Sequence, residues 1–365
     1  MKKILIVVGT RPNFVKITQF KRIIAEKYKN ELEAVILHTG QHYDNNMSDV
    51  FFQQFGLVPD YFLGIPQVSA NTQMAEIMIR LEKILIEYKP DLVIVPGDVN
   101  STLAASVTAN KMNIKLAHLE SGLRSCDRAM PEEHNRIVAD HLADLLLVTE
   151  DSGLENLAKE NIPKERILFV GNTMIDTMVY FEPQIQQTDI MNKLAVKKNE
   201  FVLMTMHRPA TVDFKEGLSK LLELITHLSE KYKIIFPVHP RTVKMMQQHG
   251  LYNDYIANKR IILTDPMDYF AFHNLIANAK LIITDSGGIQ EESTFRRIPC
   301  ITLRNNTERP STITIGTNTL LPFDLDLILK TIGEIESGTY KKGDIPPMWD
   351  GKSTERILEH LYKIL

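Results

Sequence analysis

The fold is decided by one stretch of the sequence, Leu281-Ile-Ile-Thr-Asp-Ser-Gly-Gly-Ile-Gln-Glu-Glu292. Its apolar run stops at Asp285 and turns through two glycines into a helical pattern, which predicts a strand, a tight turn and a helix start. Glycines let the backbone approach a ligand closely, and the free amides of a helix N-terminus favour phosphate. The two glutamates that follow would repel a diphosphate unless one of them faces something neutral, such as ribose hydroxyls. The stretch therefore predicts a nucleotide site.

Length and composition narrow the possible functions. At 365 residues the chain is too long for one core and suits two domains. With 42 Lys and Arg residues against 45 Asp and Glu, it has no basic field for nucleic acid. Cys126 and Cys300 form neither a disulfide framework nor a zinc pattern, which favours a reducing cytoplasm. The apolar start is too short for a signal peptide and no run reaches the length of a membrane span, so no membrane contact is expected.

Short β-rich runs alternate with amphipathic helical stretches along the chain. In the first half, strands are predicted at residues 3–8, 32–38, 92–96, 115–119 and 145–148, and helices at 13–28, 47–55, 72–88, 101–112 and 131–142. In the second half, strands are predicted at 201–206, 233–237, 260–263, 281–284 and 300–303. This alternation is typical of parallel sheets wrapped by helices, so the predicted fold class is α/β, in two halves.

The boundary between the halves is predicted after a strand at 166–171, where Gly171 and Asn172 precede a long helix. The first domain is thus expected to span 1–171 and the second 172–349. A last helical stretch over 353–365 follows a Pro-Pro-Met-Trp segment. We expect residues 350–365 to return and pack on the first domain.

In doubly wound sheets the ligand crevice lies beyond the carboxyl ends of the strands, so the residues just after each strand are the informative ones. After the first strand, Arg11 and Lys16 supply positive charge, which fits either an anion site or a solvated turn beside a surface helix. After the strand at 92–96, Asp98 either caps the next helix or faces the crevice, and a cap is the commoner role.

The densest charge follows the strand at 115–119. Glu120 comes directly after mostly apolar strand residues and should lie partly buried at the sheet edge, a position that favours a functional carboxylate. Pro131 suits the first turn of a helix, and Glu132 and Arg136 have the i, i+4 spacing of an ordinary helix salt bridge. That salt bridge is the structural alternative to a role in chemistry for these two residues.

In the second half, His207 and His239 each end a strand close to an arginine. A lone histidine is more often structural, but for two histidines at equivalent strand ends a ligand site is as good an explanation as a structural role. The aromatic residues around Phe272 suit a core, although one of them could stack on a base.

Several sequence motifs are absent. No two glycines are separated by one residue, and no glycine-rich run is followed by the lysine of a P-loop, which argues against a redox dinucleotide and a kinase-type site. The Gly-x-Ser-x-Gly elbow and the His-Glu-x-x-His metal pair are missing as well.

Nine motifs together resemble the UDP-N-acetylglucosamine 2-epimerases, in the order of that family and over almost the whole chain. They are Gly9-Thr-Arg-Pro12, Gln41-His42, Gly97-Asp98, Glu120-Ser-Gly-Leu-Arg124, Pro131-Glu-Glu-His-Asn-Arg136, Gly171-Asn-Thr-Met-Ile-Asp176, His207-Arg208-Pro209, Thr284-Asp-Ser-Gly-Gly-Ile-Gln-Glu-Glu292 and Thr307-Glu-Arg-Pro310. The resemblance implies a GT-B-like fold, with two Rossmann-like domains whose parallel sheets face across a cleft. It also implies a homodimer that acts on a UDP-sugar without metal or cofactor.

Non-hydrolysing members of that family interconvert UDP-N-acetylglucosamine and UDP-N-acetylmannosamine. The hydrogen on C2 becomes acidic only once the bond between C1 and UDP has begun to break, so elimination to a 2-acetamidoglucal and readdition fit the reaction. Two acid/base groups with different positions are then needed. The resemblance assigns this chemistry to Asp98, Glu120 and Glu132, without deciding which face of C2 each serves.

The resemblance also implies which residues hold UDP. Arg11 and His207 would meet the diphosphate, with His207 counted among the catalytic residues, and Ser286, Gly287 and Gly288 would supply donors at the helix start. Glu292 fits the ribose and Phe272 the uracil. Lys16, Arg136 and His239 match further polar positions of the cleft.

Two departures from the family pattern affect this assignment. Asn13 stands where the family commonly has Glu, which bears on the geometry around Arg11, and Pro209-Ala210 replaces the common Arg-Glu, as a subfamily mark. A 2-epimerase of UDP-2,3-diacetamido-glucuronic acid and a GT-B glycosyltransferase both remain alternatives. A regulator that only binds a nucleotide sugar is a third, but three carboxylates near an anionic ligand weaken binding unless they serve chemistry.

Overall fold

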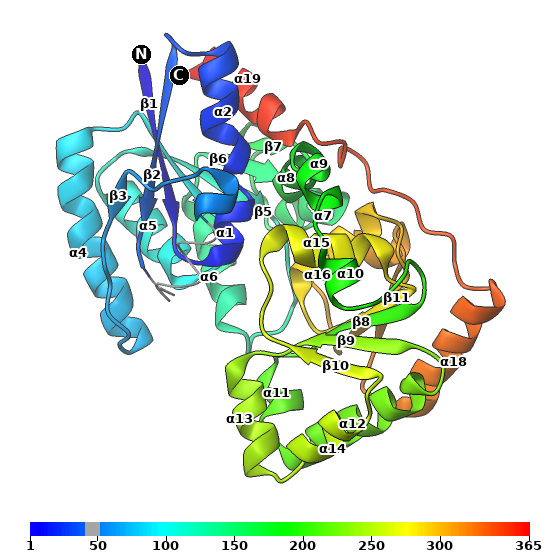
Figure 1. Ribbon diagram of the computed structural model, residues 1–365. Coiled ribbons are helices and arrows are strands. Elements are labelled where there is room, and N and C mark those ends of the chain that lie inside the picture. Colours follow the sequence, from blue (N-terminus) through cyan, green and yellow to red (C-terminus); the bar gives the residue numbers. More distant parts are fainter. Residues whose placement is uncertain (41–51) are drawn as a thin grey trace. The chain divides into compact units, whose positions relative to one another are not determined.

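The computed structural model describes residues 1–40 and 52–365, and these form two compact units. The first unit comprises Met1–Tyr180 and Pro347–Leu365, and the second comprises Phe181–Pro346. Each contains one parallel sheet with helices packed against it (Figure 1). The α/β class predicted from the sequence is confirmed.

The first unit is built on a seven-stranded sheet with the order β3-β2-β1-β4-β5-β6-β7. Its strands are β1 (Lys2–Val8), β2 (Leu32–His38), β3 (Tyr61–Phe62), β4 (Leu92–Pro96), β5 (Lys115–Ser121), β6 (Leu145–Val148) and β7 (Ile167–Phe169), and all pairs are parallel. The strand order reverses between β1 and β4. That reversal is the place where Rossmann-type sheets bind ligands, at the carboxyl ends of the strands.

The helices of the first unit are α1 (Arg11–Val15), α2 (Thr18–Lys27), α4 (Ala70–Tyr88), α5 (Asn100–Lys111), α6 (Pro131–Leu142), α7 (Asp151–Lys159), α8 (Thr173–Tyr180) and α19 (Ser353–Ile364), with a 3₁₀ turn η1 (Lys164–Arg166). The prediction of one helix over 13–28 was wrong. The helix breaks because Lys16 ends α1 as its C-cap and turns its side chain into the interior, while Ile17 leaves the helical conformation with φ −120°.

Helix α8 is fastened within the first unit. Thr177 donates a hydrogen bond to the carbonyl of Val15 at 2.5 Å, and the buried carboxylate of Asp176 accepts from the backbone N–H groups of Ser353 (3.0 Å) and Thr354 (2.6 Å). Asp176 thereby caps the start of α19. These contacts explain why the first unit runs through Tyr180, past the boundary at 171 that the sequence suggests.

The chain returns to the first unit at its C-terminus. The indole of Trp349 is buried and donates to the carbonyl of Thr149 at 2.9 Å. Helix α19 then lies beside α2, with an ion pair between Lys27 and Glu355 at 3.0 Å (Figure 1). The C-terminal helix thus belongs to the first unit.

The second unit has a six-stranded parallel sheet with the order β10-β9-β8-β11-β12-β13. Its strands are β8 (Phe201–Thr205), β9 (Lys233–Pro237), β10 (Ile261–Thr264), β11 (Leu281–Thr284), β12 (Cys300–Leu303) and β13 (Asn318–Leu321). Its helices are α9 (Glu182–Gln186), α10 (Ile190–Lys193), α11 (Pro209–Val212), α12 (Lys215–Ser229), α13 (Pro240–Gln248), α14 (Tyr252–Ala257), α15 (Tyr269–Asn278), α16 (Gly287–Phe295), α17 (Ser311–Thr314) and α18 (Leu325–Ser337). Here the order reverses between β8 and β11, next to the stretch that decides the fold.

Both faces of the second sheet are covered. Along β8, Val202 and Met204 belong to one buried apolar cluster, whereas Phe201 and Leu203 belong to another. Because successive strand residues point to opposite faces, a strand buried on both faces reads as a continuous apolar run. That run was the signal by which the sequence predicted β8.

Two short strands were not predicted. β3 is only two residues long, and β13 reads Asn-Thr-Leu-Leu, which is too polar at its start to stand out. The motif Gln41-His42 lies outside the described residues. The helix predicted at 47–55 lies partly outside them, and its described part, 52–55, is helical. No helix in the described ranges is both long and apolar enough to cross a membrane.

Candidate functional site

The loop after β1 is tied to the end of β4 by Asn13. Its side-chain oxygen accepts from the backbone N–H groups of Gly9 (3.1 Å) and Thr10 (3.2 Å), and its amide nitrogen donates to the carbonyl of Pro96 at 3.2 Å. The residue that departs from the family pattern thus holds together the two strands at the switch point. Arg11 begins α1 just before it and is partly exposed.

Glu120 occupies an irregular position in β5. The pairing of β5 with β6 shifts register between Leu119 and Ser121, and Glu120 itself has φ +69°. A bulge of this kind re-aims a side chain, and a non-glycine residue with positive φ stores strain that often accompanies function. Its side chain is 4% exposed and pairs with Lys16 through Oε2. Its other oxygen, Oε1, is buried and makes no hydrogen bond to the described part of the chain.

Gly97 lets these groups approach the backbone. It has φ +68°, and a Cβ at this position would lie 2.9 Å from Nζ of Lys16 and 3.5 Å from Oε2 of Glu120. Only glycine suits both the conformation and the space. The loop after β4 therefore lies directly against the pair of Lys16 and Glu120.

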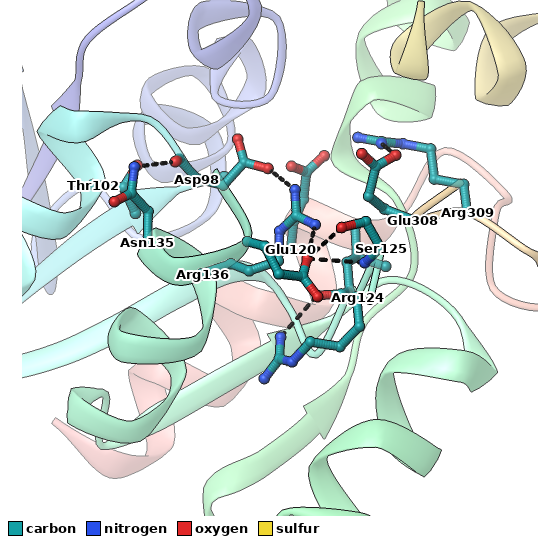
Figure 2. A network of polar contacts seen from close by, with 12 residues as sticks. Asp98, Thr102, Glu120, Arg124, Ser125, Asn135, Arg136, Glu308 and Arg309 are labelled. Atoms are coloured by element: carbon teal, nitrogen blue, oxygen red, sulfur yellow. Dashed lines mark hydrogen bonds and ion pairs between the residues drawn. The ribbon is translucent and has the colours of Figure 1, made fainter. Parts of the chain in front are cut away.

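Arg136 on α6 links two carboxylates of the first unit (Figure 2). Its guanidinium, 5% exposed, pairs with Asp98 and with Glu133 at 2.7 Å. The salt bridge to Glu132 was the structural alternative to a chemical role, but the i, i+3 residue Glu133 is buried and pairs with Arg136 instead, while Glu132 is exposed in the first turn of α6. The N-cap residue of α5 is Val99, so Asp98 stands one position before the cap.

Glu133 was missed by the sequence interpretation. It accepts hydrogen bonds from the backbone N–H and the hydroxyl of Ser125 and from the backbone N–H of Cys126, each at 2.9 Å. It therefore fixes the loop between β5 and α6 to the same arginine that holds Asp98. A Glu-Glu pair at a helix start offers no sequence signal for which member points inward.

A second buried network lies behind the first. His118 on β5 contacts the carboxylate of Asp140 through Nδ1 (2.6 Å) and the carbonyl of Gly97 through Nε2 (2.7 Å). Asp140 also pairs with Arg124 at 2.7 Å. Burial alone would raise the pKa of Asp140, but His118 and Arg124 outweigh it and the net shift is downward. These residues support the loop of Gly97 from within, and none of them was singled out as part of the site.

In the second unit, α16 begins as predicted. Ser286 is its N-cap residue, and Gly287 and Gly288 form its first turn with partly exposed backbone. A Cβ on Gly287 would lie 2.7 Å from Nη1 of Arg309, so the guanidinium rests against the glycine turn. The same arginine pairs with Glu291 at 2.8 Å. The negative charge of Glu291 is thus neutralised by Arg309 within the same unit. This explains how two glutamates can lie beside a site for an anion.

His207 and Asp285 meet at the switch point of the second sheet. Nδ1 of His207 lies 2.7 Å from Oδ1 of Asp285, and the ring is 55% exposed while the carboxylate is fully buried. The backbone N–H groups of His207 (3.0 Å) and Arg208 (2.8 Å) donate to Oδ2. Burial would raise the pKa of Asp285, but the contacts with His207 and Arg208 lower it further than burial raises it.

The remaining predicted residues of the second unit lie at separate places. Glu292 is buried, with Oε1 3.4 Å from Nε2 of His273. Phe272 is partly buried and packs against the smaller apolar cluster of the unit. His239 is exposed and serves as the N-cap of α13, where its Nδ1 accepts from the backbone N–H of Arg241 at 3.2 Å.

The predicted residues thus form two groups at two switch points. The first unit brings together Lys16, Asp98, Glu120 and Arg136, and the second brings together His207, Ser286, Gly287 and Gly288. Within residues 1–40 and 52–365, no group of three or more His, Cys, Asp or Glu side chains could hold a metal ion. Paired carboxylates and cations of this kind can move protons and neutralise charge.

Two Rossmann-type units in one chain, each with polar residues at its switch point, define a GT-B-like α/β protein. The chain belongs to the UDP-N-acetylglucosamine 2-epimerase family, whose model matches residues 25–362. A UDP-N-acetylglucosamine 2-epimerase of Methanococcus maripaludis is 39% identical over 368 residues, which cover 99% of each chain.

A solved structure and a second relative extend this comparison. The crystal structure of the Methanocaldococcus jannaschii UDP-GlcNAc 2-epimerase, in complex with UDP-GlcNAc and UDP, has a TM-score of 0.89 and 37% identity over 99% of each chain. A UDP-2,3-diacetamido-2,3-dideoxy-D-glucuronate 2-epimerase of Pseudomonas aeruginosa is 33% identical over 99% of this chain and 100% of its own length.

Proposed function

We propose that this protein interconverts UDP-N-acetylglucosamine and UDP-N-acetylmannosamine by inverting C2. The observation that carries the proposal is the buried, strained Glu120, which a bulge directs out of the β5 ladder and which Lys16 pairs on one oxygen only. A carboxylate with one oxygen paired and the other buried without a hydrogen bond can take up a proton. Membership in the epimerase family supplies the reaction that such a group would serve.

The proposed reaction proceeds by elimination and readdition. The C1–O bond breaks and its electron pair leaves with UDP, while a base removes the C2 proton and C1=C2 forms. The bound intermediates are UDP and 2-acetamidoglucal. A proton then adds to the opposite face of C2, and an oxygen of UDP attacks C1, so that atoms and charge balance without an oxidant.

The chemistry on the sugar is assigned to the first unit. Asp98, Glu120 and Glu132 are the candidates for the two acid/base roles and for stabilising positive charge at C1. Glu120 pairs with Lys16 and Asp98 pairs with Arg136, so each of these two candidates has a cation beside it. Glu132 is exposed at the start of α6, where a ligand can reach it.

The leaving group is assigned mainly to the second unit. The start of α16 with Ser286, Gly287 and Gly288 provides N–H donors for the diphosphate, joined by His207 and by Arg11 of the first unit. Glu292 would accept from ribose hydroxyls and Phe272 would stack on uracil. His239, which caps α13, is assigned a further contact with UDP.

A second candidate substrate is UDP-2,3-diacetamido-glucuronic acid, because a relative with 33% identity carries that activity in its name. The same elimination would apply, and the difference would lie in recognition of a second acetamido group and a sugar carboxylate. A glycosyltransferase, in contrast, would need an acceptor and would not invert C2.

The test is incubation of the protein with each UDP-sugar in deuterated water, followed by NMR at C2. We expect UDP-N-acetylmannosamine to accumulate with deuterium at C2. Unchanged UDP-N-acetylglucosamine together with inversion of the diacetamido sugar would replace the substrate but keep the mechanism. Both sugars unchanged would contradict the proposed function.

The expected homodimer and the cytoplasmic location remain predictions. Light scattering of the purified protein measures the first, and the location of the tagged protein in fractionated cells measures the second.

A further inference from the structure

Asp285 lies next to the side chain of His207 in the second unit. It is the first residue after β11, it is fully buried, and the sequence motifs assign it no role of its own. Oδ2 accepts from the backbone N–H groups of His207 and Arg208, and Oδ1 lies 2.7 Å from Nδ1 of His207. Oδ2 is therefore held by the loop that follows β8, and Oδ1, which is buried and accepts no hydrogen bond from the described residues, has the ring of His207 as its neighbour.

We propose that Asp285 is a positioning residue that fixes a proton on Nδ1 of His207 and thereby directs Nε2 at the ligand. The proposal rests on the proposed function, in which His207 meets the diphosphate. An ionised carboxylate has only lone pairs to offer, so the ring nitrogen that faces it must carry a hydrogen. The bond made by one ring nitrogen of a histidine decides what the other can do.

Burial separates the two partners in a way that fits this role. The carboxylate of Asp285 is 0% exposed, whereas the side chain of His207 is 55% exposed. Solvent and ligands can therefore reach the ring but not the acid. Once Nε2 is protonated as well, the ring presents both an N–H and a positive charge, and the buried carboxylate stabilises that cation. Such a group stabilises the charge that develops on departing UDP.

Replacement of Asp285 by asparagine should change which ring nitrogen of His207 carries the proton, while a side chain of the same size is kept. In Asp285→Asn the amide oxygen must stay toward the backbone N–H groups of His207 and Arg208, because the amide NH₂ would oppose two donors. The NH₂ then faces Nδ1 of His207 and requires it to accept. The single ring proton moves to Nε2, so the ring keeps a donor but loses its positive charge.

The first measurement is ¹⁵N NMR of the histidine rings in the ligand-free protein. The chain has 11 histidines, so the signal of His207 is identified by its loss in His207→Ala. We expect a proton on Nδ1 in the wild-type protein and an unprotonated Nδ1 in Asp285→Asn. An unprotonated Nδ1 in the wild type would overturn the proposal, and this result stands even if the asparagine variant does not fold.

The second measurement is a double-mutant cycle of turnover. Asp285→Asn should lower kcat roughly 100-fold with a smaller change in KM, the size expected when one oriented charge is lost from a leaving-group site. In the His207→Ala background the same substitution should lower kcat only slightly further, because Asp285 acts through His207. A full loss in both backgrounds would overturn the proposal. If the wild type turns over no UDP-sugar, the proposed function fails while the ring assignment is still decided by NMR.

Discussion

At the scale of single residues, Glu120 shows how strain and burial combine at the proposed centre. A non-glycine residue with φ +69° costs on the order of 1–3 kcal/mol, which the surrounding packing must offset. The β5 bulge places the carboxylate against Lys16 instead of the β6 ladder. The backbone strain is therefore located at Glu120, where the carboxylate departs from the regular strand geometry.

Glu120→Gln should lower kcat about 10³-fold, because it removes a proton-transfer group but keeps the size of the side chain. Binding of UDP, measured by calorimetry, should be unchanged, since UDP is assigned to other residues. The matched control is Glu26→Gln, which alters an exposed glutamate paired with Arg22 at 2.7 Å and should leave turnover intact. A Glu120→Gln enzyme with wild-type turnover would remove Glu120 from the mechanism.

Gly97→Ala tests the close approach of the β4 loop to Lys16 and Glu120. Its positive φ alone should cost about 1–2 kcal/mol in an alanine variant. Gly338 is the matched control, because it has φ +74° with nothing within 4 Å of an added Cβ. We expect Gly97→Ala to lose more free energy of unfolding than Gly338→Ala in denaturant titrations, because only at Gly97 would the added Cβ lie within 3.0 Å of another atom, Nζ of Lys16. Only Gly97→Ala should lose turnover, and equal turnover in both would show that the tight contact at Gly97 is not needed.

The sequence predicts the residues of the site better than their partners. Glu120 and Asp98 were found because each follows an apolar strand of a predicted parallel sheet, where ligands bind. Asp285 lies within the opening stretch, yet nothing in the sequence pairs it with a histidine 78 positions earlier. Glu133 and His118 were missed for the same reason, since tertiary contacts decide which polar residue turns inward.

At the scale of elements, the first turn of α6 places two neighbouring glutamates in opposite environments. Glu132 is exposed, whereas Glu133 is buried and bonded to Ser125, Cys126 and Arg136. Glu132→Gln should lower turnover and leave the free energy of unfolding unchanged. Glu133→Gln should cost about 2 kcal/mol of that free energy, because it weakens charge-assisted bonds to buried donors. The reverse pattern, seen by chemical denaturation and turnover, would contradict this division.

The segment after β12 supplies a prediction about acid stability. Glu308 is buried and pairs with Arg304 at 3.0 Å and with Arg309 at 3.4 Å. Burial would raise its pKa, but Arg304 and Arg309 lower it from 4.5 to about 2. Because the folded-state pKa is the lower one, the ionised carboxylate stabilises the fold above pH 4.5, by about 3 kcal/mol. That contribution is lost as the pH falls from 4.5 to about 2.

Glu308→Gln measures this contribution directly. Its free energy of unfolding should lie below that of the wild type at neutral pH, and the difference should shrink between pH 4.5 and about 2. A difference that does not change over this range would show that the carboxylate is not held ionised by its arginines.

Element boundaries also show where a sequence pattern stops being informative. The predicted helix over 13–28 has continuous helical periodicity, and the break between α1 and α2 appears only because Lys16 turns inward to an acid 104 positions away. β13 escaped prediction because a polar start hides a strand that pairs with β12 on one side only. In both cases a tertiary contact overrides the local signal.

At the scale of the molecule, the two units repeat one topology. The six strands of the second sheet follow the same order as the first six of the first sheet, so each unit has its own switch point. The alternation of strands and helices predicted two α/β halves, and the resemblance to the epimerases implied that each half is Rossmann-like. The side chains differ between the two switch points: carboxylates gather at that of the first unit, and a helix N-terminus with a histidine lies at that of the second.

In the proposed reaction, UDP leaves the sugar and returns during each inversion of C2. Positional isotope exchange tests it with a substrate that carries ¹⁸O in the bridge between C1 and the β-phosphorus. Once UDP is free of the sugar, this oxygen becomes equivalent to the other terminal oxygens of the β-phosphate. We predict that ³¹P NMR will show the label moving to non-bridging positions at a rate comparable to epimerisation. Inversion of C2 with the label retained entirely in the bridge would show that UDP does not leave the sugar during the reaction.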